Sequence, residues 1–117
     1  MFYHFSQNNS GGRFHFNEKL SHHVIIEAGS AAEANCIAEG LGVYFDGVEN
    51  DQDCACCGDR WYPVWGQGDD EPLLYAEHPA SYHEHFVQPG DVYCRVFYSD
   101  GRVAEHRVPA PAQLEEK

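Results

Sequence analysis

Three cysteines stand within four residues of the chain, at Cys54, Cys56 and Cys57. Cys54 and Cys57 have the C-x-x-C spacing of a metal-binding turn, and Gly58 follows with the backbone freedom that such a turn needs. Thiolate sulfur and imidazole nitrogen are the ligands that zinc prefers, and a structural site takes four of them. The sequence therefore predicts a structural zinc ion held by Cys54 and Cys57. A tight turn with reduced thiols is one alternative. A redox C-x-x-C is another, which the lack of a preceding thioredoxin-like βαβ pattern disfavours.

The other two ligands must come from elsewhere, because the sequence has no second C-x-x-C. Cys56, inside the turn, could supply a third thiolate. In the 78–85 segment, His83 and His85 are separated by one residue and would share one face of a strand. Cys36 and Cys94 lie in a helical and a strand pattern, so we expect them to be small core residues. The predicted metal ligands are Cys54, Cys57, Cys56, His83 and His85.

A second candidate site is the amide-rich and glycine-rich segment 7–12. Main-chain N–H groups of such a loop can hold an anion, although the lysine of a phosphate-binding P-loop is missing. The predicted ligand-binding residues are Asn8, Asn9, Ser10 and Gly12. A long hairpin turn is the simpler interpretation, because Asn, Ser and Gly favour turns for local reasons.

Recognised catalytic motifs such as G-x-S-x-G and H-E-x-x-H are absent from the sequence. A metal-dependent hydrolase would need an open coordination position beside a carboxylate, for which Glu84 is the candidate. Near the cysteines, Arg60 is expected to pair with Asp53 or Asp59, and Trp61 to cover the metal turn.

The chain carries a formal net charge of -12, from 19 acidic and 7 basic residues. Phosphates would be repelled, which argues against direct binding to nucleic acid or to an anionic membrane. A protein partner with a basic surface suits this charge. The sequence shows neither a signal peptide nor a stretch of transmembrane length, so we expect a cytoplasmic protein with reduced thiols.

One helix is well marked by its ends. Ser30 and Glu33 form a capping box, and Gly40 or Gly42 can end the helix with a left-handed residue. The apolar residues expected on its buried face are Ala34, Ile37, Ala38 and Leu41. The histidines of the predicted strands are expected to have surface or cross-strand roles; they are His4, His15, His22 and His23.

The strands follow from alternation and turn signals. Segments 2–5 and 13–17 predict a first hairpin, and 22–28 predicts a strand buried on both faces. Short strands are expected at 43–45 and 73–75. The last hairpin joins 92–98 to 102–108 through a type I′ turn at Asp100 and Gly101, so that Val96 faces Glu105.

These elements predict an α+β fold, with an antiparallel sheet of five or six strands and one helix packed on one face. Residues 1–108 would form a single domain, in which 47–72 is a cysteine-containing loop held by the metal. Residues 109–117 contain two prolines and are expected to form a flexible tail.

Five segments, 1–3, 6–12, 24–28, 44–47 and 53–61, resemble a family of small uncharacterised proteins encoded by tailed bacteriophages. The most specific part is the cysteine run DCACCGDRW at 53–61, which accompanies the SQNNSGG loop at 6–12. The resemblance implies a phage-type accessory protein made in the bacterial cytoplasm, and it carries no catalytic role over to this chain.

Three functions are compatible with the sequence. The first is a non-enzymatic protein that binds a host or phage protein, with its long loop held by structural zinc. The second is a binder of a small molecule or nucleotide signal, with a pocket near the 7–12 loop. The third is a metal-dependent hydrolase. The acidic surface and the thiolate-rich half-site favour binding without catalytic turnover.

Overall fold

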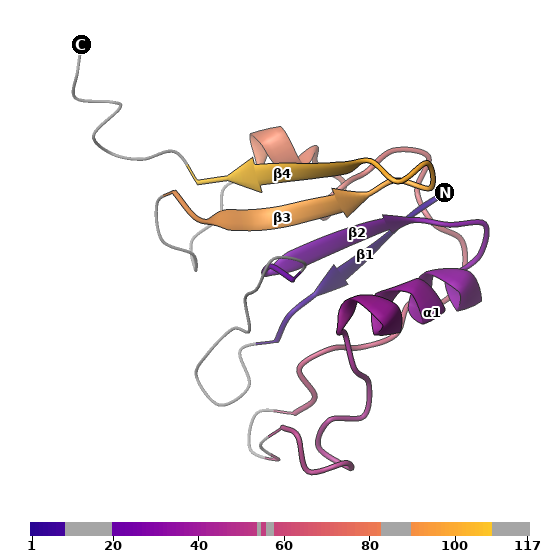
Figure 1. Cartoon of the computed structure of the whole chain (residues 1–117), viewed down its shortest axis with the longest axis vertical. Coiled ribbons are helices and arrows are strands. Elements are labelled where there is room, and N and C mark those ends of the chain that lie inside the picture. The colour runs from indigo at the N-terminus through magenta and orange to yellow at the C-terminus, as the bar shows by residue number, and fades with distance from the viewer. Residues whose placement is uncertain (9–19, 54, 56–57, 83–89, 109–117) are drawn as a thin grey trace.

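The computed structural model describes residues 1–8, 20–53, 55, 58–82 and 90–108. Its elements are β1 (Phe2–Ser6), β2 (His23–Glu27), α1 (Ala31–Leu41), the short 3-10 helix η2 (Pro79–Ser81), β3 (Val92–Phe97) and β4 (Val103–Arg107). The strands form one sheet in the order β1-β2-β3-β4 (Figure 1). No helix in these ranges is long and apolar enough to cross a membrane.

The predicted α+β class with one α-helix is confirmed, but the described sheet differs from the predicted antiparallel sheet of five or six strands. The described residues form four strands, and the central pair, β2 and β3, runs parallel. The two outer pairs, β1 with β2 and β3 with β4, are antiparallel. The connection from β2 to β3 includes α1 and a long loop, so no tight turn requires these strands to be antiparallel. The predicted strand at 13–17 lies outside the described residues.

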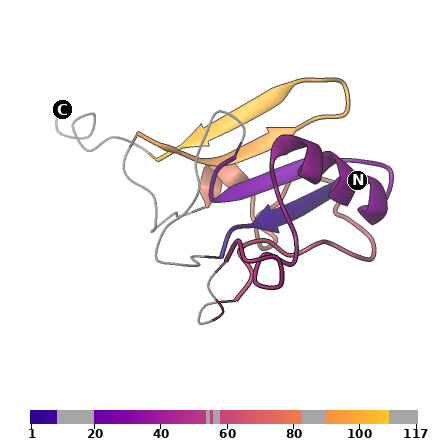
Figure 2. The same cartoon turned by 60° about the horizontal axis from the view of Figure 1, so that its bottom comes forward.

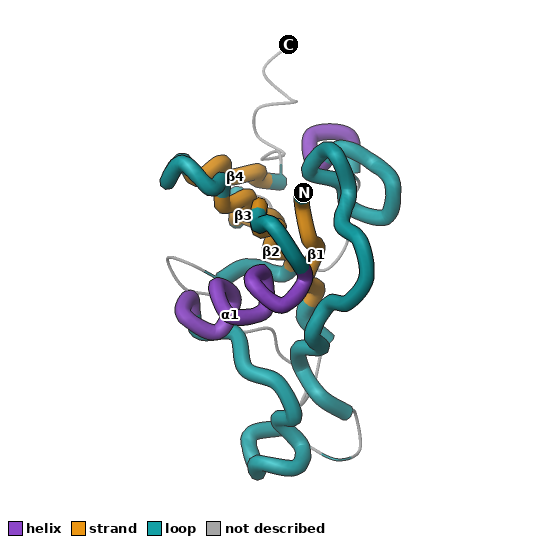
Figure 3. The backbone as a smooth tube through the Cα atoms, turned by 90° about the vertical axis from the view of Figure 1, so that its right-hand side faces the viewer, coloured by secondary structure: helices purple, strands orange, loops and turns teal. Residues whose placement is uncertain are grey.

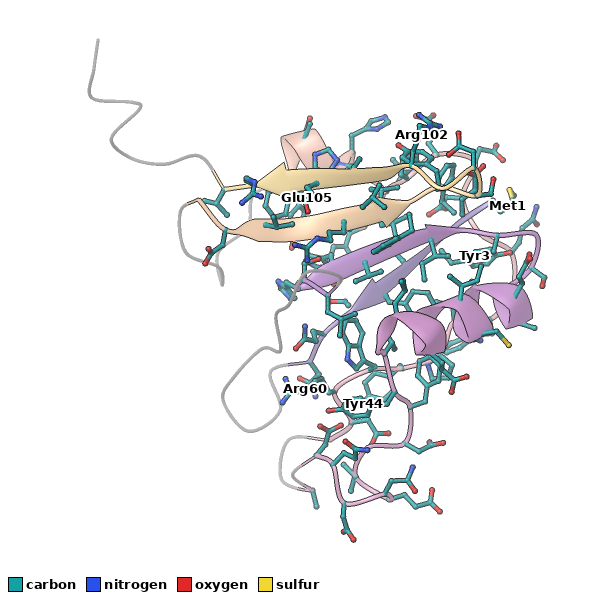
Figure 4. The ribbon with its side chains drawn as sticks, viewed as in Figure 1. Met1, Tyr3, Tyr44, Arg60, Arg102 and Glu105 are labelled. Carbon is teal, nitrogen blue, oxygen red and sulfur yellow. The ribbon has the colours of Figure 1, made fainter. Side chains whose placement is uncertain are left out.

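β2 is the centre of the sheet, as its apolar sequence predicts. Val24, Ile25 and Ile26 are all buried, because β1 and β3 flank the strand and both faces are covered. Helix α1 lies against one face, where β1 contributes Tyr3 and Phe5 to the core (Figure 4). Core residues on the opposite face include Ile25, Leu74, Tyr93, Cys94 and Val96.

The ends of α1 agree with the sequence. The Ser30 hydroxyl oxygen accepts a hydrogen bond from the Glu33 N–H at 3.1 Å, and Gly42 closes the helix with φ 114°. Ala34 and Ala38 are buried as predicted, whereas Ile37 is 37% exposed. The face of α1 that packs on the sheet therefore includes fewer of the apolar residues than the sequence predicts.

The segments that flank the long loop differ from their predicted form. Residues 43–45 do not form a strand, because the Val43 N–H donates to the Ala38 carbonyl and completes the end of the helix. At 73–75 the structure has only an isolated bridge between Leu74 and Glu77. Figure 2 shows the chain after α1 passing below the sheet, on the side away from β4.

The hairpin of β3 and β4 is present, but its register is shifted by one residue from the predicted one. Val96 faces Ala104, and Arg95 faces Glu105. The turn is longer than expected, since the Gly101 N–H donates to Tyr98 and the Tyr98 N–H donates to Arg102. Gly101 has φ 96°, whereas Asp100 is not left-handed, which excludes a type I′ turn. The geometry is that of a three-residue loop with a glycine bulge.

Candidate functional site

A buried polar cluster anchors the long loop. The Arg60 N–H donates to Asp53 Oδ2 at 2.7 Å, and Arg60 Nε lies 3.5 Å from Asp53 Oδ1. Tyr44 donates its hydroxyl to the same carboxylate at 2.7 Å and accepts from Arg60 Nε at 3.1 Å (Figure 4). Burial, followed by the bond to Asp53, raises the pKa of Tyr44. The Asp53–Arg60 pair confirms the expected role of Arg60 and ties together the two ends of the cysteine segment.

The same cluster reaches the start of the predicted ligand loop. Arg60 Nη1 donates to the Gln7 side chain at 3.1 Å, and Gln7 donates to the Ser21 carbonyl at 3.0 Å. The Asn8 N–H donates to the Arg60 carbonyl at 2.7 Å, and Asn8 Nδ2 donates to the Asp59 carbonyl at 3.1 Å. Described residues next to the two predicted sites are therefore in contact, and Asn8 joins two segments of the chain.

The other predicted site residues lie outside the described part of the chain: Cys54, Cys56, Cys57, His83, His85, Asn9, Ser10 and Gly12. Among the residues that are described, no group of three or more His, Cys, Asp or Glu side chains could hold a metal ion. The zinc prediction therefore stays a prediction. Trp61 is 1% exposed and belongs to the core beneath α1.

After Trp61 the chain runs along the outer edge of β1 (Figure 3). Phe2 and Asp69 exchange main-chain hydrogen bonds of 2.8 and 2.9 Å. Gly68 is needed for this approach, because a Cβ there would lie 2.6 Å from the Phe2 carbonyl oxygen and 2.9 Å from the Tyr3 ring. The loop is thus held closely against the first residues of β1.

Further along β1 the loop stands away from the strand and leaves a groove of about 330 Å³. This β1-edge groove is lined by His4, Phe5, Ser6, Tyr62, Pro63, Val64 and Trp65. Trp65 is 81% exposed and Tyr62 is 53% exposed. Tyr75, which is 64% exposed, borders the groove by packing edge-on against the His4 ring at 5.0 Å between centroids.

A histidine pair underlies one wall of the groove. His4 Nε2 and His23 Nδ1 lie 2.8 Å apart across β1 and β2, which confirms a cross-strand role. Burial, together with the nearby His23 and His22, lowers the pKa of His4 to about 3. His4 is therefore neutral at physiological pH, so its ring contributes polar atoms to the groove without positive charge.

The sequence reasoning missed the groove, although one signal of it was present. Tyr62 and Trp65 stand in a polar loop beside Pro63 and Gly66, outside any helical or strand periodicity. Aromatic residues in such a position are candidates for a contact surface. Only the path of the loop along β1 shows which strand they adjoin.

A protein-family model described as a domain of unknown function, DUF7296, matches residues 1–112, so the chain belongs to this family. No curated protein matches the chain. No solved structure matches it either.

Proposed function

We propose that this member of the DUF7296 family acts by binding a protein partner with a basic surface, and that the β1-edge groove is the contact site. The exposure of Trp65 is the observation that carries the proposal. Its side chain is 81% exposed beside a groove, although the domain buries Trp61 almost completely. Tryptophan and tyrosine are the residues that most often anchor protein interfaces.

The surroundings of the groove favour a basic partner. Its described lining contains neither Lys nor Arg, and His4 is held neutral. Asp69 and Asp70 are exposed just beyond the end at which the loop meets Phe2. With a net charge of -12 over the whole chain, this arrangement would attract a cationic surface and repel an anionic one.

The biological setting of the proposal comes from sequence resemblance. The 6–12 and 53–61 segments resemble tailed-phage proteins, which supports a phage-type accessory protein acting on a host or phage protein in the bacterial cytoplasm. Arg60 contacts Gln7, and Asn8 contacts Asp59, so described residues of the two segments hold each other in place in the fold.

Structural zinc is a further part of the proposal. Cys54 and Cys57 would supply two thiolates, with the remaining ligands drawn from Cys56, His83 and His85. The Asp53–Arg60 pair supports this role, because it brings together the residues that flank the cysteines. A metal at this point would fix the loop that carries Tyr62 and Trp65.

Binding of a small molecule is the second candidate, since about 330 Å³ is within the range of ligand pockets. A nucleotide signal would need cationic groups for its phosphates, and the described lining offers none. The predicted loop residue Asn8 is not part of this lining. A metal-dependent hydrolase would rest on Glu84, which lies outside the described residues.

Affinity capture from bacterial lysate tests the proposed function. The parent chain should retain a protein that is released as salt rises, because the attraction is electrostatic. Trp65→Ala should lose this protein, whereas Val103→Ala, at another exposed apolar residue, should keep it. Equal retention by both variants would place the contact elsewhere, and a parent chain that retains no protein would argue against the function itself.

A further inference from the structure

The outer edge of β1 has main-chain groups that its neighbours leave open. Met1 and Gln7 bond to Ala28 and His22 on the β2 side. Phe2 instead bonds outward, to Asp69. Hydrogen-bonding direction alternates along a strand, so the main-chain N–H and C=O groups of His4 and Ser6 also point outward.

The loop bonds to this edge at two places only within the described residues. Asp69 meets Phe2 at one end, and the Arg60 carbonyl accepts from Asn8 at the other. Between these points the loop uses more residues, 60 to 69, than β1 does from 2 to 8. The excess chain arches away at Tyr62 to Trp65, and no main-chain hydrogen bond from the described residues reaches His4 or Ser6.

The geometry points to strand addition: an extended segment of the partner, flanked by Lys or Arg, enters the β1-edge groove and pairs with the main chain of His4 and Ser6. This inference rests on the proposed protein-binding function and deepens it. A short extended segment satisfies both residues, because one partner residue would pair with His4 and the residue two positions away with Ser6.

The side chains around the groove set the chemistry of that segment. An added strand would place alternate side chains against the His4–Tyr75 wall and toward the exposed rings of Tyr62 and Trp65. Apolar or β-branched residues suit both positions, because the described lining carries no charged group at neutral pH. A basic residue at the end of the segment nearest Phe2 would face Asp69 and Asp70, and one at the other end would suit the net charge of -12.

A peptide display library provides the probe. Its peptides have about seven residues, an ordinary strand length, with Lys at both ends and random central positions. The matched library has Glu at both ends. The purified chain should enrich members of the Lys library with alternating apolar residues and none of the Glu library. Absence of enrichment from the Lys library, or equal enrichment from both, would overturn the inference.

Main-chain recognition is then tested on the enriched peptide. N-methylation of both edge-facing amides should weaken binding by about tenfold or more, because each lost hydrogen bond weakens binding by about fivefold. Ser6→Pro removes an outward N–H that β2 does not use, and it should weaken binding similarly. Val103→Pro removes an outward N–H of the β4 edge instead and should bind within about twofold of the parent chain.

Contrary outcomes separate this inference from the proposed function. Equal affinity of methylated and unmethylated peptides would overturn strand addition, while lysate capture that still depends on Trp65 would leave protein binding intact. Amides of His4 and Ser6 that become protected at high protein concentration without peptide would make a second copy of the chain the occupant, and would also overturn the inference.

Discussion

The two edges of the sheet differ in how they are protected. β4 presents Val103, Glu105 and Arg107 at its exposed positions, and Glu105 forms ion pairs of 3.1 Å with both Arg95 and Arg107 (Figure 4). Charged side chains on an edge strand disfavour pairing with another chain. β1 has no Asp, Glu, Lys or Arg, and its protection comes from a loop that touches its ends. The open part of β1 is therefore the edge better suited to a partner.

The two edges also depend on different kinds of interaction. The β4 edge is held by a local hairpin with exposed charges, whereas the loop over β1 depends on the buried Arg60–Asp53 pair. Local structure tolerates surface substitutions, and buried ionic groups do not tolerate the loss of one partner. Substitutions on the β1 side should accordingly have the larger effects.

Loss of the proposed zinc ion should have the largest effect on the β1 side. The Cys54→Ser, Cys57→Ser double variant should lose about one zinc ion per chain and melt well below the parent, because a structural site contributes its binding energy to folding. Elemental analysis and thermal melts with and without chelator measure both quantities. A parent chain that contains no metal and melts unchanged in chelator would remove zinc from the account.

Asp53→Ala should have the second-largest effect on stability. It leaves the Arg60 guanidinium buried without its carboxylate, which should lower the free energy of unfolding by about 3 kcal/mol or more. Arg107→Ala removes the guanidinium of the exposed Arg107–Glu105 pair on β4 and should have a much smaller effect. Urea denaturation of both variants compares the two edges directly, and equal losses would contradict the difference drawn between them.

Gly68→Ala should separate the loop from β1. The new methyl group would clash with the Phe2 carbonyl and the Tyr3 ring, at an expected cost of about 1–3 kcal/mol. Gly40→Ala is the matched control, since a Cβ in that part of α1 meets nothing within 4 Å. There the change should stabilise by about 0.5–1 kcal/mol. If both variants unfold like the parent, the loop does not approach β1 closely.

Gly101→Val should have the smallest effect of these. Gly101 has φ 96°, which a β-branched residue adopts only with strain, so a loss of about 1 kcal/mol is expected. The change is confined to the β3–β4 turn, and peptide binding at the β1-edge groove should be unaffected. A weakened groove would mean that the two edges are coupled.

Local patterns predicted the parts of the fold that depend on local chemistry. The Ser30 cap, the Gly42 end of α1 and the buried β2 all follow from neighbouring residues. The parallel pairing of β2 and β3 could not be predicted in this way, because no turn joins these strands. The predicted hairpin register was wrong because Asp100 and Gly101 also suit a three-residue loop.

The candidate site was only partly accessible from the sequence. Pairing of Arg60 with Asp53 could be expected, since the residues are close in the chain and opposite in charge. The contact of Gln7 with Arg60 is long-range and carries no periodic signal. Gly68 is ordinary in sequence and becomes necessary only where the loop meets β1.

Hydrogen–deuterium exchange of the complex captured from lysate tests the central claim most directly. The outward amides of β1, at His4 and Ser6, should exchange more slowly in the complex than in the free chain. The amides of Val103 and Glu105 are the matching outward amides of β4, because the Tyr98–Arg102 bond points inward and the direction alternates along the strand. Their exchange rates should be the same in the complex and in the free chain. Protection at β4 with none at β1 would contradict the assignment of the β1-edge groove as the binding site.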